Sequence, residues 1–362
     1  MLSDSSPSAE LPALSPPPNV TSNFTDPPSL MPWIIAVLVV TMILMFAVVG
    51  IRVFTRVKLV KEWRLEDYLA IAALVGVSVW NILFAFTANL GLSRHQWDVR
   101  LKDLPRLLLL TNILETIYGP TMFALKLSVL LQLKRIFCSS YQRDSVWWIL
   151  MTLIASVTIY YWACFFSFVF QCWPRAKIEN PGIDGVCIDI LSATLAAGII
   201  NLVTDVGMLV APMFAIWRLQ MPIKRKFGVA AVFGVGLFAC ITGLLGVIWR
   251  WPLLKSSDFT WIISKVGLWA MAEYCAIILV GSMPSIPLFY KSIIRKDSKA
   301  PSYNPSGDGG RGTISRKNKK ANTFLSSALG PDTNAAYVTI DEGSQGAKNS
   351  ERISLDEFNG PK

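Results

Sequence analysis

The sequence has 362 residues but only one histidine, His95. Histidine is the commonest metal ligand and the usual group for proton transfer near neutral pH, so its scarcity argues against a histidine-based metal centre or acid–base site. The six cysteines include no pair with the CxxC spacing that is typical of zinc and redox motifs. We therefore predict that the protein uses no metal ion and no cofactor.

Charged residues are also scarce, at 16% of the chain, against about 25% in a typical soluble domain. Hydrophobic residues make up 53% of the chain, and the mean hydropathy is +0.47. This composition indicates a membrane protein. The net charge of +10 would otherwise suggest a nucleic-acid partner, but the basic residues fall between apolar segments rather than in one patch. We interpret them as the charge bias of membrane-protein loops and predict no nucleic-acid binding.

The first 30 residues contain no lysine or arginine and no apolar core. A secretory signal peptide needs a basic start and an apolar centre, so this segment is not one. Its richness in proline and serine predicts a disordered tail over residues 1–30. The tail holds two N-glycosylation sequons, which begin at Asn19 and Asn23, and these matter only if the tail lies outside the cytosol.

Seven apolar segments are each long enough to cross the hydrocarbon core, which takes about 20 helical residues. They cover approximately residues 31–51, 67–90, 106–133, 146–170, 189–217, 227–249 and 260–289. The sequence therefore predicts an all-α membrane protein, a seven-transmembrane helix bundle over residues 31–290. Its surroundings are the lipid bilayer of the plasma membrane or of an endomembrane. Residues 291–362, rich in Gly, Ser, Asn and Lys, are predicted to form a disordered cytosolic tail.

The distribution of basic residues predicts the orientation of the bundle. The segments 52–64, 134–143, 218–226 and 291–299 hold sixteen lysines and arginines. The segments on the other side, which include the N-terminal tail, hold eight. Because basic residues accumulate in cytoplasmic loops, we expect the N-terminus outside and the C-terminus in the cytosol.

Charged residues inside the predicted spans are expensive to bury in lipid, so we expect them to pair or to serve a function. Lys126 and Glu115 are eleven residues apart in the third span, which places them on nearly the same helix face about 16 Å apart along the axis. Lys126 and Asp205 of the fifth span lie at similar depth and are expected to form a buried ion pair. That pair either fixes the helix register or belongs to a polar cavity.

Four further charged residues fall in the outer half of the predicted bundle. They are Glu115, Arg250, Lys265 and Glu273. Because a cavity in the outer half is open to the outside, we expect these residues to surround a ligand pocket.

Two cysteines, Cys172 and Cys187, lie in one short loop on the predicted outer side. This side of the membrane is oxidising, which favours a disulfide between them. The bridge would close a ring of 16 residues, worth about 3 kcal/mol in the chain-entropy description. Two free cysteines are the alternative.

Seven short motifs follow one another in a fixed order. They are Arg52 with Arg56, WRLEDYLAIAA, NLGLSRHQWD, LKLSVLLQLKRIF, FQCWP with GVC, Asp205 in NLVTDVGMLVAP, and Glu273 in MAEYCAIIL. Over about residues 33–290 the sequence resembles the fungal rhodopsin-domain family, which includes receptor-like proteins and satratoxin-cluster membrane proteins. The resemblance implies a seven-helix bundle like that of G-protein-coupled receptors, and some family members are encoded beside secondary-metabolite genes.

The motifs of photoreceptors and of animal receptors are not reproduced. A retinal-binding lysine would lie deep in the last span, where this chain has Glu273, and Lys265 lies close to the outer end. We predict a receptor-like membrane protein that binds a small ligand in its outer half, without retinal, and acts through a cytosolic signalling partner. Two alternatives stay open: a membrane enzyme or accessory factor of a fungal secondary-metabolite pathway, with Glu115, Glu273 or Asp205 as acid–base group, and a transporter.

Overall fold

The computed structural model describes residues 11–138, 145–180, 182–217 and 223–294. These residues belong to the first of two compact units, residues 1–310, and the second unit, residues 311–362, lies outside the described residues. The predicted C-terminal tail therefore falls outside them too, except that a short helix continues past residue 290 to Ile294.

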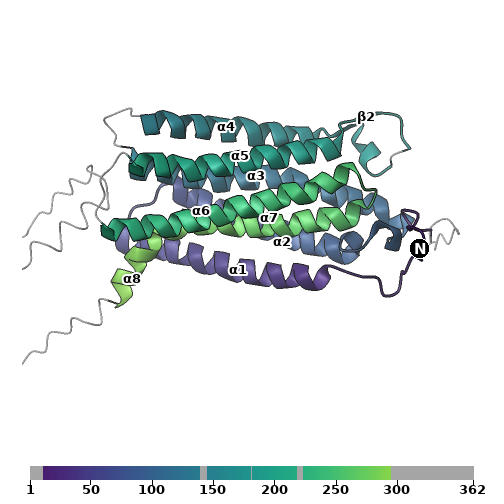
Figure 1. Ribbon diagram of the computed structural model, residues 1–362, viewed down its shortest axis with the longest axis horizontal. Helices are drawn as coiled ribbons and strands as arrows, with labels where there is room; N and C mark the ends of the chain where they lie inside the picture. Colours follow the sequence, from purple (N-terminus) through teal and green to yellow (C-terminus); the bar gives the residue numbers. More distant parts are fainter. Residues whose placement is uncertain (1–10, 139–144, 181, 218–222, 295–362) are drawn as a thin grey trace, which may run out of the picture. The chain divides into compact units, whose positions relative to one another are not determined.

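Seven helices within the described ranges are long and apolar enough to cross a membrane. They are α1 Met31–Phe54, α2 Leu65–Thr87, α3 Leu104–Phe137, α4 Ser145–Val169, α5 Ile190–Trp217, α6 Ile223–Arg250 and α7 Phe259–Ser282. They run side by side in a bundle (Figure 1). This confirms the predicted all-α, multi-pass membrane fold.

Shorter elements connect and extend these helices. They are η2 Thr55–Val60, η3 Ala88–Leu92, η4 Gln96–Asp98, η5 Leu101–Asp103, η6 Arg175–Ile178, η7 Trp251–Leu254, η8 Met283–Ser285, α8 Ile286–Ile294 and the strands β1 Cys172–Trp173 and β2 Val186–Cys187. We call the end of the bundle that carries residues 11–30 and the loop between α2 and α3 the N-tail end. The other end, which carries η2 and α8, is called the opposite end.

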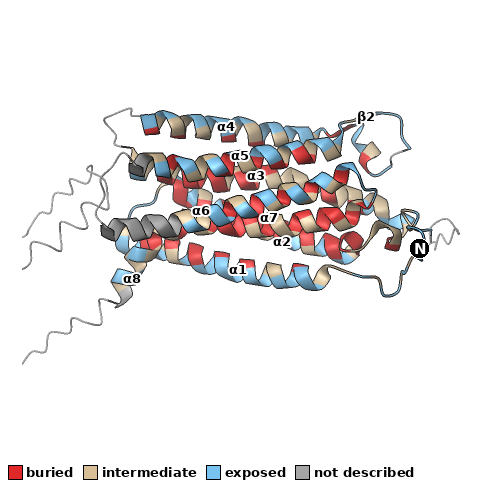
Figure 2. Cartoon of the chain, viewed as in Figure 1, coloured by how far each residue is buried: buried red, intermediate tan, exposed pale blue. Residues whose placement is uncertain are grey.

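The position of each helix in the bundle follows from how much of its surface is covered. Within the most apolar 18 residues of each span, 67% are buried in the span that contains α7, against 17% in α4. Figure 2 shows the same contrast between α7 and α4. Helix α7 is therefore central, and the uncovered apolar side chains of α4 are suited to lipid contact.

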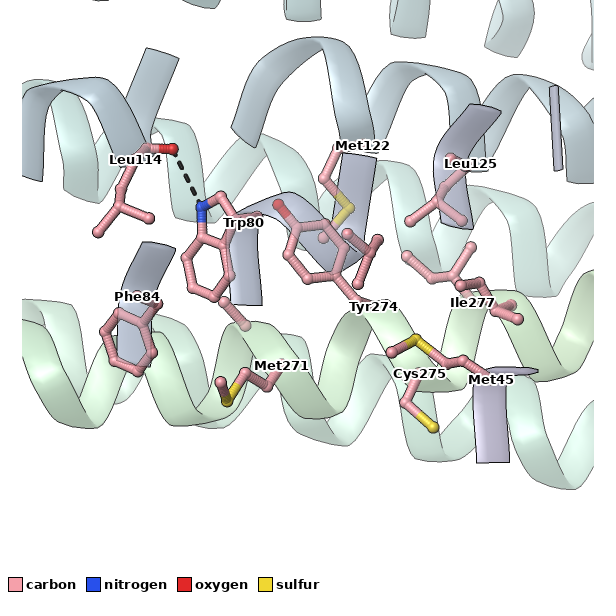
Figure 3. Packing of buried hydrophobic residues seen from close by; sticks show 14 of the residues in the cluster. Met45, Trp80, Phe84, Leu114, Met122, Leu125, Met271, Tyr274, Cys275 and Ile277 are labelled. Carbon is pink, nitrogen blue, oxygen red and sulfur yellow. Dashed lines mark hydrogen bonds between the residues drawn. The ribbon is translucent and has the colours of Figure 1, made fainter. Parts of the chain in front are cut away.

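Aromatic side chains from α2 and α7 form the middle of the core (Figure 3). Trp80 stacks on Phe84 with ring centroids 5.1 Å apart and meets Tyr274 edge-on at 5.4 Å. The indole nitrogen of Trp80 donates a hydrogen bond of 3.0 Å to the carbonyl oxygen of Leu114 on α3. A buried tryptophan needs such a partner for its N–H, so this bond fixes α2 against α3.

Residues 11–30 are held against the loop between α2 and α3, whereas the composition had suggested disorder throughout residues 1–30. Ala13 donates a backbone hydrogen bond to Val99, and Leu30 donates one to Ser93. The backbone N–H of Asn23 donates to the buried carboxylate of Asp98 at 2.8 Å. Backbone pairing of this kind depends little on side-chain hydrophobicity, so composition alone does not reveal it.

The single histidine, His95, contributes further contacts at the N-tail end. The ring of His95 stacks between the rings of Trp97 and Trp261, and its Nδ1 atom lies 2.5 Å from Oδ2 of Asp258. Asp258 precedes α7 and also accepts the backbone N–H of Gln96 at 2.9 Å. These contacts attach the α2–α3 loop to the start of α7.

At the opposite end, a network of arginines and carboxylates is buried where α1, α2, α3 and α7 meet. Arg52 donates to Asp67 at 3.0 Å and to the carbonyl oxygen of Gly281 at 2.7 Å. Arg135 of α3 lies 2.7 Å from Glu66. We expected Arg52 in an inner loop, but it is buried within α1 because its guanidinium reaches the N-terminus of α2.

Cys172 and Cys187 form a disulfide between the paired strands β1 and β2, as predicted. Replacing both by serine is expected to lower the free energy of unfolding by about 3 kcal/mol, because the bridge restricts the unfolded loop. Thermal unfolding of the purified protein measures this. A reducing agent should destabilise the wild type and leave the double variant unchanged; equal sensitivity of the two would contradict the prediction.

Candidate functional site

A cavity of about 70 Å³ lies among the helices in the half of the bundle next to the N-tail end. Its walls include Trp80, Phe84, Glu115, Tyr118, Thr194 and Arg250. A single water needs about 10–15 Å³ of such space, so the cavity is large enough for a small organic group. Its walls are mainly apolar, and the charged groups come from one side chain of α3 and one of α6.

Arg250 is the last residue of α6 and is only 7% exposed. Its Nε atom is buried without a hydrogen-bond partner among the described residues. The glycine at position 198 of α5 makes room for this side chain, because a Cβ atom there would lie 2.8 Å from Cδ of Arg250. A buried guanidinium with an unmet donor is costly unless another molecule supplies an acceptor.

Glu115 lies on the cavity wall and accepts a hydrogen bond of 3.1 Å from the hydroxyl of Thr194 on α5. It is close enough to Arg250 for their charges to interact. The two nevertheless form no ion pair within the part of the chain that the structure describes. The cavity thus presents a guanidinium group and a carboxyl group to anything bound between them.

Toward the middle of the bundle, Lys126 is fully buried and lies at the centre of a second polar group. Its Nζ atom is 2.8 Å from Oδ1 of Asp205. It donates to the Asn201 side chain at 2.7 Å and to the Thr204 hydroxyl at 2.8 Å. Such a satisfied ammonium holds α3 and α5 in one register.

The amide of Asn201 extends this group to two more helices. Tyr161 of α4 donates its hydroxyl proton to Oδ1 of Asn201, and Nδ2 of Asn201 donates to Oε1 of Glu273 on α7. We call Lys126, Asn201, Thr204, Asp205 and Glu273 the central polar cluster. It joins side chains of α3, α5 and α7 in one contact network.

The structure divides the four residues expected around one pocket. Glu115 and Arg250 line the cavity, whereas Glu273 belongs to the central polar cluster. Lys265 lies over the rings of Trp249 and Trp261, with its Nζ atom 4.3 Å and 5.2 Å from their centroids. The expectation was built on depth along each helix, but eight residues separate 265 from 273, which turns their side chains about 80° apart.

The neutral members of the central polar cluster, Asn201 and Thr204, were not predicted to be site residues. Asn201, Thr204 and Asp205 have the spacing i, i+3, i+4, which places all three on one face of α5. This spacing was a usable signal. Tyr161 and Thr194 gave none, because single hydroxyl groups are common in helices, and only the packing of α4 and α5 against α3 reveals their partners.

Comparison with known proteins adds a family and several relatives. The model of the fungal rhodopsin domain matches residues 51–292. A SAT4 family membrane protein of Emericella nidulans is 34% identical over 208 residues, which are 57% of this chain and 52% of that protein. Fugralins biosynthesis cluster protein 2 of Gibberella zeae is 28% identical over 297 residues, or 80% of this chain and 73% of that protein.

Wortmanamides biosynthesis cluster protein C of Talaromyces wortmannii is 28% identical over 173 residues, which are 48% of this chain and 46% of that protein. The matched region therefore spans about half the length of the Emericella and Talaromyces relatives. No solved structure matches the chain significantly.

Proposed function

Because the chain belongs to the fungal rhodopsin-domain family of multi-pass membrane proteins, we propose that it is a receptor-like protein that binds a small ligand in the cavity beside Arg250 and Glu115. The ligand is mainly apolar and carries a carbonyl or carboxylate oxygen. The observation that carries this proposal is the buried Nε atom of Arg250, which has no acceptor among the described residues although it lines an apolar cavity.

The chemistry of the walls supports this class of ligand. Indole, phenyl and aliphatic groups surround most of the cavity, so a ligand gains free energy chiefly by burying apolar surface. A guanidinium presents its N–H groups in a planar fork, which fits a carboxylate or a carbonyl. Glu115 can accept a hydroxyl group of the same ligand.

The surroundings of Lys126 and Lys265, the two lysines inside the predicted spans, support binding without retinal. A retinal Schiff base needs a lysine whose amine reaches the ligand. The amine of Lys126 is paired with Asp205 and hydrogen-bonded to Asn201 and Thr204, and Lys265 lies over two tryptophan rings. Neither lysine is among the residues that line the cavity.

We further propose that the N-tail end faces outward and that the opposite end faces the cytosol. The sequence segments 52–64, 134–143, 218–226 and 291–299, predicted to be cytosolic, hold twice as many lysines and arginines as the segments predicted to be outside. In this orientation the sequons at Asn19 and Asn23 are outside, the cavity opens toward the outside, and a signalling partner binds at the opposite end.

A purified-protein binding experiment tests the ligand site. Benzoate and octanoate are expected to raise the melting temperature of the wild-type protein in detergent, because the carboxylate meets Arg250 and the apolar part fills the cavity. In Arg250→Leu we expect the shift to disappear, a loss of at least about tenfold in affinity, since a charge-assisted hydrogen bond contributes about 1.5–3 kcal/mol.

The matched control is Lys102→Leu, which removes a positive charge at the same end but from an exposed side chain outside the cavity. This variant should keep the wild-type shift. An equal loss in both variants would mean that the acids bind through general charge, and no shift in any protein would count against a carboxylate ligand.

A role in a secondary-metabolite pathway is the second candidate, and the printed names of two relatives favour it. In that role the cavity would hold a pathway intermediate, and Glu115 would act as its acid–base group. Deleting the gene and profiling metabolites separates the two functions. Loss of one product with accumulation of its precursor supports the pathway role, whereas an unchanged profile supports the receptor.

A further inference from the structure

The central polar cluster contains more acidic than basic groups. Lys126 supplies one positive charge, whereas Asp205 and Glu273 are both carboxyl groups, and their residues are 0%, 3% and 2% exposed. Lys126 forms an ion pair with Asp205 at 2.8 Å. Among the described residues, no ion pair gives Glu273 a positive partner, and its Oε1 atom accepts a hydrogen bond from the neutral amide of Asn201. With both carboxyl groups ionised, the cluster would carry an uncompensated negative charge.

The two carboxyl groups face the same point in the bundle. A Cβ atom on Gly243 of α6 would lie 3.4 Å from Oδ2 of Asp205 and 3.9 Å from Oε1 of Glu273. Gly243 therefore lets α6 close over both oxygens without a side chain between them. Two carboxylates that face the same buried space repel each other, so they do not both stay ionised.

The other titratable groups near the cluster do not supply the missing positive charge. Tyr118 of α3, Tyr161 of α4, Cys240 of α6 and Tyr274 of α7 all interact electrostatically with Glu273 or Asp205. Phenols and thiols are neutral or negative, never positive. Arg250, another buried cation, lines the cavity and forms no ion pair with Asp205 or Glu273 among the described residues.

Asp205 provides a second, independent observation. Both of its carboxylate oxygens are buried and accept no hydrogen bond of ordinary geometry among the described residues, although Lys126 lies beside Oδ1. A buried carboxylate normally fills its acceptor positions. An oxygen of Asp205 can thus accept a further hydrogen bond, and the protonated carboxyl group of Glu273 could donate it.

We propose that the central polar cluster is a proton-binding site that holds one exchangeable proton between Asp205 and Glu273. With this proton, Lys126 and the two carboxyl groups together carry no net charge; without it, they carry one negative charge. Because the cluster connects side chains of α3, α5 and α7, release of the proton adds repulsion where these helices meet. The site is distinct from the ligand cavity and does not depend on the proposed ligand.

Infrared spectroscopy of the full chain in lipid nanodiscs tests the charge count. The Glu115→Gln background is used throughout, because Glu115 is a further carboxyl inside the bundle. At neutral pH this protein should show the carbonyl band of a protonated carboxylic acid, which shifts when H₂O is replaced by D₂O. Glu273→Gln and Asp205→Asn should each abolish the band, since the remaining carboxylate pairs with Lys126.

Lys126→Met should instead increase the area of the band about twofold, because both carboxyl groups then need a proton to stay neutral. Asp258→Asn, which changes a carboxyl at the N-tail end, should leave the band unchanged. If Lys126→Met does not fold, the two carboxyl variants decide alone.

Absence of the band from the parent protein, or its survival in both carboxyl variants, would overturn the proposal. A sodium-dependent rise in melting temperature that Glu273→Gln abolishes, without any carbonyl band, would assign a metal cation in place of the proton and overturn it as well.

Discussion

Lys126→Met is expected to lower the free energy of unfolding by about 3–5 kcal/mol, the usual cost of removing one partner of a buried ion pair. The variant takes the counter-charge from Asp205 and the donor from Asn201 and Thr204, all in the fully buried middle of the bundle. Thermal unfolding in detergent, followed by circular dichroism, measures the loss.

Lys265→Met is the matched control, because it removes the same side chain from another membrane-spanning helix. Lys265 lies over two tryptophan rings and has no ion-pair partner among the described residues, so we expect a loss of only about 0.5–1 kcal/mol. The double variant Lys126→Met/Asp205→Asn should regain part of the stability lost in Lys126→Met. Equal losses in the two lysine variants would show that the ion pair contributes little.

Asp67→Asn is expected to have an effect of similar size, about 3–5 kcal/mol, at the opposite end. Asp67 is 2% exposed and lies 3.0 Å from Arg52 and 3.2 Å from Arg56. It also accepts the backbone N–H of Arg64 at the start of α2. The asparagine side chain has nearly the same shape as the aspartate, but it leaves the buried guanidinium groups of Arg52 and Arg56 without their nearest negative charge.

Glu62→Gln makes the same chemical change in an exposed pair at that end. Glu62 and Arg64 are 2.8 Å apart, but their side chains are 51% and 38% exposed, so the expected loss is at most about 1 kcal/mol. Comparing the two melting temperatures separates the buried network from general surface charge. A loss for Glu62→Gln as large as for Asp67→Asn would refute the role given to the network.

Several features of the fold could be predicted from the sequence because they depend on local composition. Each span is apolar over a length that matches the bilayer, so the number of helices and their approximate bounds were correct. The disulfide was predictable for a similar reason, since both cysteines lie in one short loop. The backbone pairing of residues 11–30 with the loop between α2 and α3 was not predicted, because such pairing leaves no trace in composition.

The site depended on contacts between helices. The sequence identified several charged residues inside the spans, since a charge in lipid stands out against apolar neighbours, but it placed the buried Arg52 in a loop. It did not reveal the rotation of α6 and α7 about their axes, so it grouped Glu273 and Lys265 with Glu115 and Arg250. Packing brings Glu273 to Asn201 and Lys265 to Trp249 and Trp261 instead.

The sequence by itself thus determined a seven-helix membrane protein with rare charges inside its spans, because hydropathy and helix length are properties of each segment alone. Only the tertiary structure decided which charges meet. In the folded protein, Lys126 forms an ion pair with Asp205. The Nε atom of Arg250 has no acceptor among the described residues beside the cavity, and Asp205 and Glu273 face one glycine of α6. These outcomes depend on the rotation and spacing of neighbouring helices, which the packing of the whole bundle sets.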